Sequence, residues 1–457
     1  MEFSAQLARF RERTEDPGLA GLIVLGTRQP ITSALLIGTL SLERVAFLLT
    51  DQTRDMPVQV AELLGRSPDE WLCPAGDHST TLRVYEGVKE VLEAWSDIDR
   101  SRIAVDVTGG FKPMSVGLEK AAHLLGLTTL YVESDYGPIS PEGKIGPIPG
   151  TQRLIIPPDP YQVFGDLEAA EARRLYAAHD YAGARRIFAE LAQRVSGPNG
   201  QVYGACAALA DAYARWDAFD LLGAQEVLDL VNVQALPGSA AVARPILEAQ
   251  IAALRTLNAA GARIGSGPGP SLDILHDQQV VLALLGSLYT NALRREAQGR
   301  YDVAALLLYR CLELLSQHRL AAYGVLTERP DLQLLLQLRP SLDADYRAVE
   351  DLVGFRPRGL PQPGRNGRLP PIALFGGYML LAALDDALVH GFAIEQIRER
   401  AEARNKSILA HGYRLITEDE YRQFRSVVEE MLDRFFAVLA TDRGDWERTF
   451  TFLRLDT

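Results

Sequence analysis

The chain has 457 residues, of which 47% are hydrophobic and 23% are charged, and its formal net charge is −12. This is the composition of a globular protein with two or three domains, and it excludes a disordered or collagen-like chain. The acidic balance argues against a protein that coats duplex nucleic acid with a general basic surface, so we expect no DNA partner.

The three cysteines, Cys73, Cys206 and Cys311, are far apart and form no CxxC spacing, so the sequence predicts neither a zinc site nor a disulfide framework. The N-terminus lacks the basic-then-apolar order of a signal peptide, and no apolar run reaches the roughly eighteen residues of a membrane span. We therefore expect a cytoplasmic protein with no membrane partner, metal or cofactor.

The first part of the chain alternates short apolar runs with helical patterns. The expected elements are strands at 22–25, 45–49, 103–105, 129–132 and 153–156 and helices at 79–96 and 113–125. Short buried strands separated by helices predict a mostly parallel, Rossmann-like α/β sheet with helices on both faces. Ligands bind such sheets at the carboxyl ends of the strands.

A Pro-Pro-Asp-Pro sequence at 157–160 ends this pattern and predicts a domain boundary. Almost all of the remaining chain has helical patterns. A glycine- and proline-rich linker at 265–270 divides it in two, and a Pro/Gly/Arg-rich stretch at 355–371 is expected to be an exposed loop. The predicted domains are 1–157, 158–270 and 271–457.

Two helical segments, at 176–188 and 296–308, resemble each other. Each has the pattern of a helix, a tight turn and an aromatic residue that opens the next helix, as in tetratricopeptide-type repeats. Two copies 120 residues apart indicate two similar hairpins and not a continuous array.

The loop after the third of the central strands has the chemistry of an anion site. Asp106-Val-Thr-Gly-Gly-Phe-Lys-Pro-Met114 follows a buried strand and opens a helix, whose free N–H groups attract anions. Thr108 and Lys112 add a hydroxyl and a charge, while Gly109 and Gly110 permit a tight turn. The sequence matches neither a Walker A loop nor the dinucleotide GxGxxG pattern. A second polar turn, Gly26-Thr27, is expected at the same sheet edge.

This combination resembles the CRISPR-associated Rossmann-like (CARF) sensor domain. The resemblance covers roughly residues 18–157 and implies a homodimer that binds a cyclic oligoadenylate across its two-fold axis. The contacts that it implies are Gly26, Thr27, Thr108, Gly109, Gly110 and Lys112. Phe111 stands where relatives often carry a small polar residue, so the resemblance leaves open whether the domain degrades its activator.

The second signal lies near the C-terminus, in Arg404-Asn-Lys-Ser-Ile-Leu-Ala-His411-Gly412. A spacing of seven predicts that Arg404 and His411 share one helix face, with Gly412 ending the helix and the helix dipole favouring a charged His411. Histidine moves protons and arginine stabilises anionic transition states, so the pair suits RNA transesterification without a metal. The spacing alone is unspecific, because Arg173 and Arg174 precede His179 in a similar way.

The segment resembles the active helix of HEPN (higher eukaryotes and prokaryotes nucleotide-binding) ribonucleases, and residues 299–315 resemble an earlier long helix of that group. The order of sensor, all-α connector and all-α HEPN domain resembles the CARF–HEPN ribonucleases of type III CRISPR systems. This resemblance implies a homodimeric single-stranded RNA endoribonuclease in antiviral defence. It would be allosterically activated by cyclic tetra- or hexa-adenylate and would form 2′,3′-cyclic phosphate ends. The implied catalytic residues are Arg404, Asn405 and His411.

Several alternatives stay open at this point. Ser407 either supports His411 or is a surface serine, and Arg310 and Glu313 either buttress the site or form an exposed ion pair. The ring size of the activator and the base preference of cleavage are not determined. A nucleotide-sensing binding module with a tetratricopeptide-like scaffold and no nuclease activity is the main alternative function. A small-molecule enzyme is less favoured, because residues 1–157 carry no cofactor fingerprint.

Overall fold

The computed structural model describes residues 2–139, 145–265, 271–365 and 368–455. The chain divides into two compact units, Met1–Val163 and Phe164–Thr457. Of the linker predicted at 265–270, only Gly265 lies within the described residues.

The first unit is built on a five-stranded sheet with the strand order β2-β1-β3-β4-β7. Pairing is parallel except between β4 and β7, which are antiparallel. A separate hairpin is formed by β5 and β6. The strands are β1 Gly21–Leu25, β2 Arg44–Leu48, β3 Ile103–Asp106, β4 Thr128–Glu133, β5 Tyr136–Pro138, β6 Ile145–Pro147 and β7 Arg153–Ile155.

Helices cover both faces of this sheet, as predicted, because alternate strand residues point to opposite sides. Leu22 and Val24 of β1 pack with α1, α2 and α3, whereas Ile23 and Leu25 pack with α4 and α5. The helices of this unit are α1 Phe3–Arg13, α2 Ile31–Thr39, α3 Met56–Leu64, η1 Pro68–Glu70, α4 Thr81–Ala94, η2 Arg100–Arg102 and α5 Lys112–Leu125, with α6 Pro160–Phe164 at the junction.

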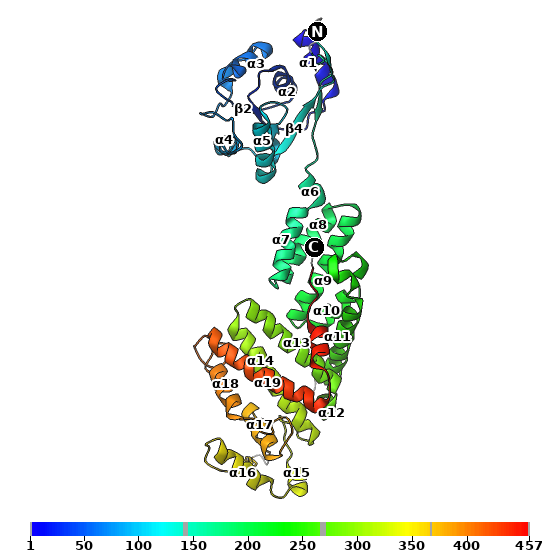
Figure 1. Cartoon of the computed structure of the whole chain (residues 1–457), viewed down its shortest axis with the longest axis vertical. Coiled ribbons are helices and arrows are strands. Elements are labelled where there is room, and N and C mark those ends of the chain that lie inside the picture. Colours follow the sequence, from blue (N-terminus) through cyan, green and yellow to red (C-terminus); the bar gives the residue numbers. More distant parts are fainter. Residues whose placement is uncertain (1, 140–144, 266–270, 366–367, 456–457) are drawn as a thin grey trace. The chain divides into compact units, whose positions relative to one another are not determined.

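The second unit is helical throughout its described elements. Its largest contacts are between α8 and α9 and between α13 and α14, and α19 packs against α14 (Figure 1). The elements are α7 Asp166–Ala177, α8 Tyr181–Arg194, α9 Gly197–Asp217, α10 Leu221–Leu228, η3 Val233–Ala235, η4 Gly238–Val242, α11 Arg244–Ile264, α12 Leu272–His276, α13 Gln278–Ala297, α14 Tyr301–Ala322, α15 Gln333–Leu338, α16 Leu342–Leu352, α17 Leu374–Ala383, α18 Glu395–Asn405, α19 Glu418–Leu439 and α20 Arg443–Phe450.

The two hairpins predicted from the repeated segments are confirmed, with Tyr181 and Tyr301 opening α8 and α14. Their turns have left-handed residues at His179 (φ 61°) and Gly299 (φ 70°), each followed by the backbone bond that closes a Schellman-type helix end. The turn before α10 has the same geometry, with Phe219 at φ 61°. The sequence comparison missed this third copy because α10 opens with Leu221 and not with the aromatic residue that opens α8 and α14.

The C-terminal segment after α20 returns to the first helices of this unit. The carbonyl of Leu453 accepts a hydrogen bond from the Tyr176 hydroxyl at 2.8 Å, and its N–H donates to the Tyr213 hydroxyl at 3.1 Å. The Phe452 ring stacks on the Tyr213 ring at 3.9 Å. One hydrophobic core consequently joins α7–α11 with α13, α14, α19 and α20. Among the described residues, no helix combines the length and apolarity needed to cross a membrane.

Candidate sensor and nuclease sites

The two polar turns of the first unit lie together at one edge of its sheet. Because β1 and β3 are parallel neighbours, with Val24 beside Asp106, their carboxyl ends meet at the same edge, as predicted. Thr27 and Gly109 are in close contact, since a Cβ atom on Gly109 would lie 3.1 Å from the Thr27 Cβ. The structure therefore brings the predicted turns into one surface.

The conformation of the second turn depends on its own side chains. Gly110 has φ +81°, a left-handed value that favours glycine. Asp106 is buried and accepts hydrogen bonds from the Thr108 N–H, at 2.9 Å, and from the Thr108 hydroxyl. The same hydroxyl accepts from the Val132 N–H at 2.7 Å. Thr108 thus ties the loop to β4 and β3.

Burial raises the pKa of the Asp106 carboxyl, and the hydrogen bonds from Thr108 oppose that effect. A buried carboxylate is costly unless it is hydrogen-bonded, so Asp106 and Thr108 hold the loop as a unit. Lys112 is the first residue of α5, is exposed, and follows the Phe111 N-cap. Its ammonium group and the free N–H groups of the helix start together favour the binding of an anion at this end of α5.

The expected helix through Arg404 and His411 is wrong. The helix α18 ends at Asn405, and residues 406–414 form a closed loop in which Ser407 and Arg414 make a β-bridge. The helix ends here for a local reason. At Gly412 the backbone folds back so close to the Lys406 carbonyl that no side chain would fit. Gly412 therefore closes a loop instead of capping a helix, and the dipole argument for His411 does not apply.

The loop nevertheless keeps the predicted catalytic residues together. Arg404 is in the last turn of α18, and the His411 N–H donates to the Asn405 carbonyl at 3.3 Å. The His411 side chain is exposed. Ser407 is buried and lies off the helix, so the alternative of a surface serine is wrong. Its N–H donates to the Arg404 carbonyl at 2.9 Å, which makes it part of the loop's framework.

Sequence reasoning missed Tyr309 of α14, which lies against Arg404. The guanidinium carbon of Arg404 is 4.4 Å from the centre of the Tyr309 ring, and its Nη1 donates to the Asn405 side-chain oxygen at 3.1 Å. The Arg404 Nε is buried with no hydrogen-bond partner among the described residues. The contact with the face of the Tyr309 ring therefore contributes most to the position of the Arg404 guanidinium. No sequence signal separated Tyr309 from other aromatic residues of its helix.

Replacing Tyr309 with alanine should reduce RNA cleavage about tenfold, because a cation–π contact contributes about 0.5–2 kcal/mol. Tyr309→Phe keeps the ring and should stay within about twofold of the wild type in the same single-turnover assay. Equal losses in both variants would mean that the hydroxyl, and not the ring beneath Arg404, carries the effect.

The neighbouring pair of Arg310 and Glu313 is partly exposed, and Glu313 also has a side-chain hydrogen bond with Tyr309. Arg310 donates to the Glu313 carboxylate and to the Gln317 side chain, each at 3.1 Å, and the Arg310 and Glu313 side chains are 39% and 29% exposed. Such pairs contribute little to stability. Among the described residues, no group of three or more histidine, cysteine, aspartate or glutamate side chains is arranged to hold a metal ion.

Comparisons with known proteins agree with this architecture. Residues 164–259 match the model of the Csm6 6H domain, and residues 275–435 match that of the Csm6 HEPN domain. The CRISPR system endoribonuclease Csm6 of Thermus thermophilus is 28% identical over 409 residues, which are 85% of this chain and 79% of that protein.

A solved structure of Enterococcus italicus Csm6, bound to cyclic hexa-2′-fluoro-hexa-dAMP, has a TM-score of 0.51 and 11% identity. The match covers 94% of this chain and 97% of that one, which indicates a shared fold across both units. Arg404, Asn405 and His411 all lie inside the matched HEPN segment. Since the two domain models together account for more than half of its residues, the chain belongs to the Csm6 family of CRISPR-associated HEPN proteins.

Proposed function

We propose that this protein is a single-stranded RNA endoribonuclease of a type III CRISPR system, activated when a cyclic oligoadenylate binds its N-terminal unit. The observation that carries the proposal is that Arg404 and Asn405 at the end of α18 lie beside His411 of the following loop, within the matched HEPN segment. The endoribonuclease name of the Thermus relative supports the same activity. In this proposal residues 1–157 are a CARF sensor, 158–270 a connector and 271–457 the nuclease.

The sensor assignment rests on the paired turns at the sheet edge. Thr27, Gly109 and Gly110 lie at this edge, and Lys112 adds a positive charge at a helix start. Gly26 is buried, and its N–H donates to the Leu48 carbonyl at 2.8 Å, so it would shape the turn instead of contacting the ligand. The E. italicus structure holds a cyclic oligonucleotide, which supports this class of activator. Thr108 would act partly through the loop, because its hydroxyl already bonds Asp106 and Val132.

The proposed reaction uses side chains at the end of α18 and in the loop that follows it. The ribose 2′-hydroxyl attacks the adjacent phosphorus, so that a 2′-O–P bond forms while the P–O5′ bond breaks. Two protons move in this step, because the 2′-hydroxyl loses one and the departing O5′ gains one. His411 carries out one of these transfers and water the other, and Arg404 stabilises the extra negative charge on the phosphoryl oxygens. The products carry a 2′,3′-cyclic phosphate and a 5′-hydroxyl. The exposed position of His411 leaves it accessible to RNA.

We further propose that two copies of the chain act together, with two loops facing one substrate. Two Arg404 side chains would then create a local positive field on a protein whose net charge is −12. Ligand binding to the paired sensors would favour the dimer geometry in which the loops bind RNA productively. A cytoplasmic setting is part of the same proposal.

The test is cleavage of a fluorescent single-stranded RNA, alone and with cyclic oligoadenylates of three to six units, with and without EDTA. We expect cutting with one ring size, unchanged by EDTA, and products with cyclic phosphate ends by mass spectrometry. Cutting that EDTA abolishes would contradict a metal-independent reaction. Binding of a ring without cutting under any condition would favour the binding-module alternative.

A further inference from the structure

A cavity of about 460 Å³ in the helical unit has the charge of an anion site. It lies between α7, the start of α8, α13 and the C-terminal segment, and its cationic lining comes from Arg173, Arg294 and Arg454, with His179 beside them. No aspartate or glutamate is among its described lining residues. Arg404, Asn405 and His411 do not line it, so it is separate from the candidate nuclease loop.

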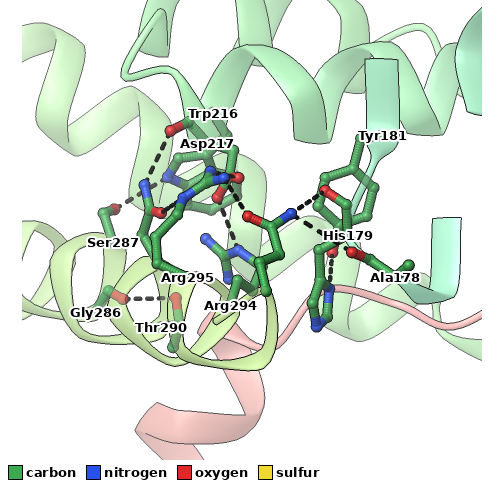
Figure 2. Close-up of polar contacts among 12 residues, drawn as sticks. Ala178, His179, Tyr181, Trp216, Asp217, Gly286, Ser287, Thr290, Arg294 and Arg295 are labelled. Atoms are coloured by element: carbon green, nitrogen blue, oxygen red, sulfur yellow. Dashed lines mark hydrogen bonds and ion pairs between the residues drawn. The ribbon is translucent and has the colours of Figure 1, made fainter. Parts of the chain in front are cut away.

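Arg294 is the buried member of this group. Its side chain is 7% exposed, and its Nε donates to Asp217 at 2.8 Å. Figure 2 shows that Arg295 turns to the same carboxylate, so that one aspartate faces two arginines. The guanidinium carbon of Arg294 lies 3.9 Å from the centre of the Phe452 ring. Its Nε is the atom that bonds Asp217, and its two terminal nitrogens make no hydrogen bond within the described part of the chain.

This arrangement leaves a buried positive charge only partly compensated. Burial lowers the pKa of Arg294 to about 10, and burial, followed by the charges of Arg294 and Arg295, lowers the pKa of His179. Protein interiors tolerate such a cation when it is paired with an anion. The Asp217 carboxylate is shared with Arg295. A second anion bound at the terminal nitrogens of Arg294 would therefore balance the charge of Arg294.

Arg173 and Arg454 supply further donors to the lining of the cavity. Arg173 comes from α7, and its Nε is buried with no hydrogen-bond partner among the described residues. Arg454 is exposed on the C-terminal segment, and within the described part of the chain neither of the two forms an ion pair. Guanidinium groups from three separate elements therefore line one space. Their planar forks match the oxygens of a phosphate.

The aromatic residues of the cavity serve a different purpose. Phe452 is covered by Tyr213 on one face and by Arg294 on the other, and the Tyr181 hydroxyl contacts His179 Nδ1 at 2.9 Å. No free ring face is left for a nucleobase among these residues. The cavity would consequently recognise the negative charge and the oxygen atoms of a ligand, and not a base.

We propose that this cavity binds a phosphate group, supplied either by the backbone of an RNA strand or by a free phosphate or nucleotide. The Arg173-to-His179 spacing, which resembles the nuclease pattern by chance, then marks two residues of this second site. A phosphate bound there would bridge α7, α13 and the C-terminal segment, and so would tie the 6H segment to the HEPN segment.

The test compares the full-length wild type with Arg173→Gln/Arg454→Gln, leaving the buried Arg294–Asp217 pair intact. Binding of inorganic phosphate, AMP and a six-nucleotide uridine RNA is measured by isothermal titration calorimetry. We expect the double variant to bind at least one of these probes about a hundredfold more weakly, because two charge-assisted hydrogen bonds are lost. The matched control is Arg185→Gln/Arg186→Gln, which removes two arginines of α8 that do not line the cavity.

Location is checked by modification with phenylglyoxal, which reacts with arginine, followed by mass spectrometry. The bound probe should protect Arg173 and Arg454 but leave Arg185 reactive. If the double variant loses affinity only for RNA, the bound phosphate belongs to an RNA backbone. If it loses affinity for phosphate or AMP, the ligand is a free anion. Equal affinities of wild type and double variant for all three probes, or no protection, would overturn the proposal. Neither readout depends on cleavage or on cyclic oligoadenylate.

Discussion

Replacing His411 with alanine should lower the rate of activated RNA cleavage by about 10²–10⁴-fold, the usual contribution of a positioned proton donor or acceptor. Binding of cyclic oligoadenylate should be unchanged, because His411 and the sensor turns belong to different units. The rate is measured in single-turnover reactions with saturating activator, and ligand binding is measured separately by calorimetry.

The matched control is His390→Ala. His390 lies in the same HEPN segment, is exposed, and pairs with Asp385 at 3.0 Å, but it lies outside both the end of α18 and the 406–414 loop. We expect it to cleave at the wild-type rate. If His411→Ala also cleaves normally, the site assignment is wrong. A loss in both variants, with lower thermal stability, would indicate damage to the fold rather than to catalysis.

A modified substrate can separate the two proton-transfer roles of His411. An RNA with sulfur in place of the 5′-bridging oxygen has a leaving group that needs no proton. If His411 protonates the leaving group, the alanine variant should cleave this substrate nearly as fast as the wild type. If the loss persists, His411 acts on the attacking 2′-hydroxyl instead.

The strands of the first unit could be predicted because each is a short, continuous apolar run. All five predicted runs appear as strands within about two residues of the expected ends, and the loop at Asp106 follows from the strand, the glycines and Pro113. The roles of the side chains in the Asp106–Lys112 loop could not be predicted from the sequence in the same way. The bond from Val132 to Thr108 joins residues 24 positions apart, and only the fold brings them together.

The error at His411 has a clear physical origin. A spacing of seven places two residues on one helix face only if the helix continues through both of them. The spacing itself does not indicate where the helix ends. The close approach of Gly412 to Lys406 depends on the folded loop. The cluster of Arg294, Arg295 and Asp217 was equally inaccessible, because the aspartate is 77 residues from the first arginine and lies on another helix.

Reversing the charge of Lys112 should give the second large effect. In Lys112→Glu a carboxylate would face the phosphates of the activator at the start of α5, so the activator concentration for half-maximal cleavage should rise at least about a hundredfold. Lys112→Gln, which only removes the charge, should raise it about tenfold, since a hydrogen bond to a charged group contributes about 1.5–3 kcal/mol. The cleavage rate at saturating activator should stay the same for Lys112→Gln.

The matched control for this series is Lys120→Gln, an exposed lysine two turns further along α5 and away from the helix start. It should leave the half-maximal concentration unchanged, because the attraction of a helix start falls off within its first turn. If Lys112 and Lys120 variants respond alike, the effect reflects the general charge of the unit. If neither responds while cleavage still needs the activator, the ligand binds away from the turns at the ends of β1 and β3. If Lys112→Gln lowers the saturated rate instead, Lys112 takes part in transmitting activation and not only in binding.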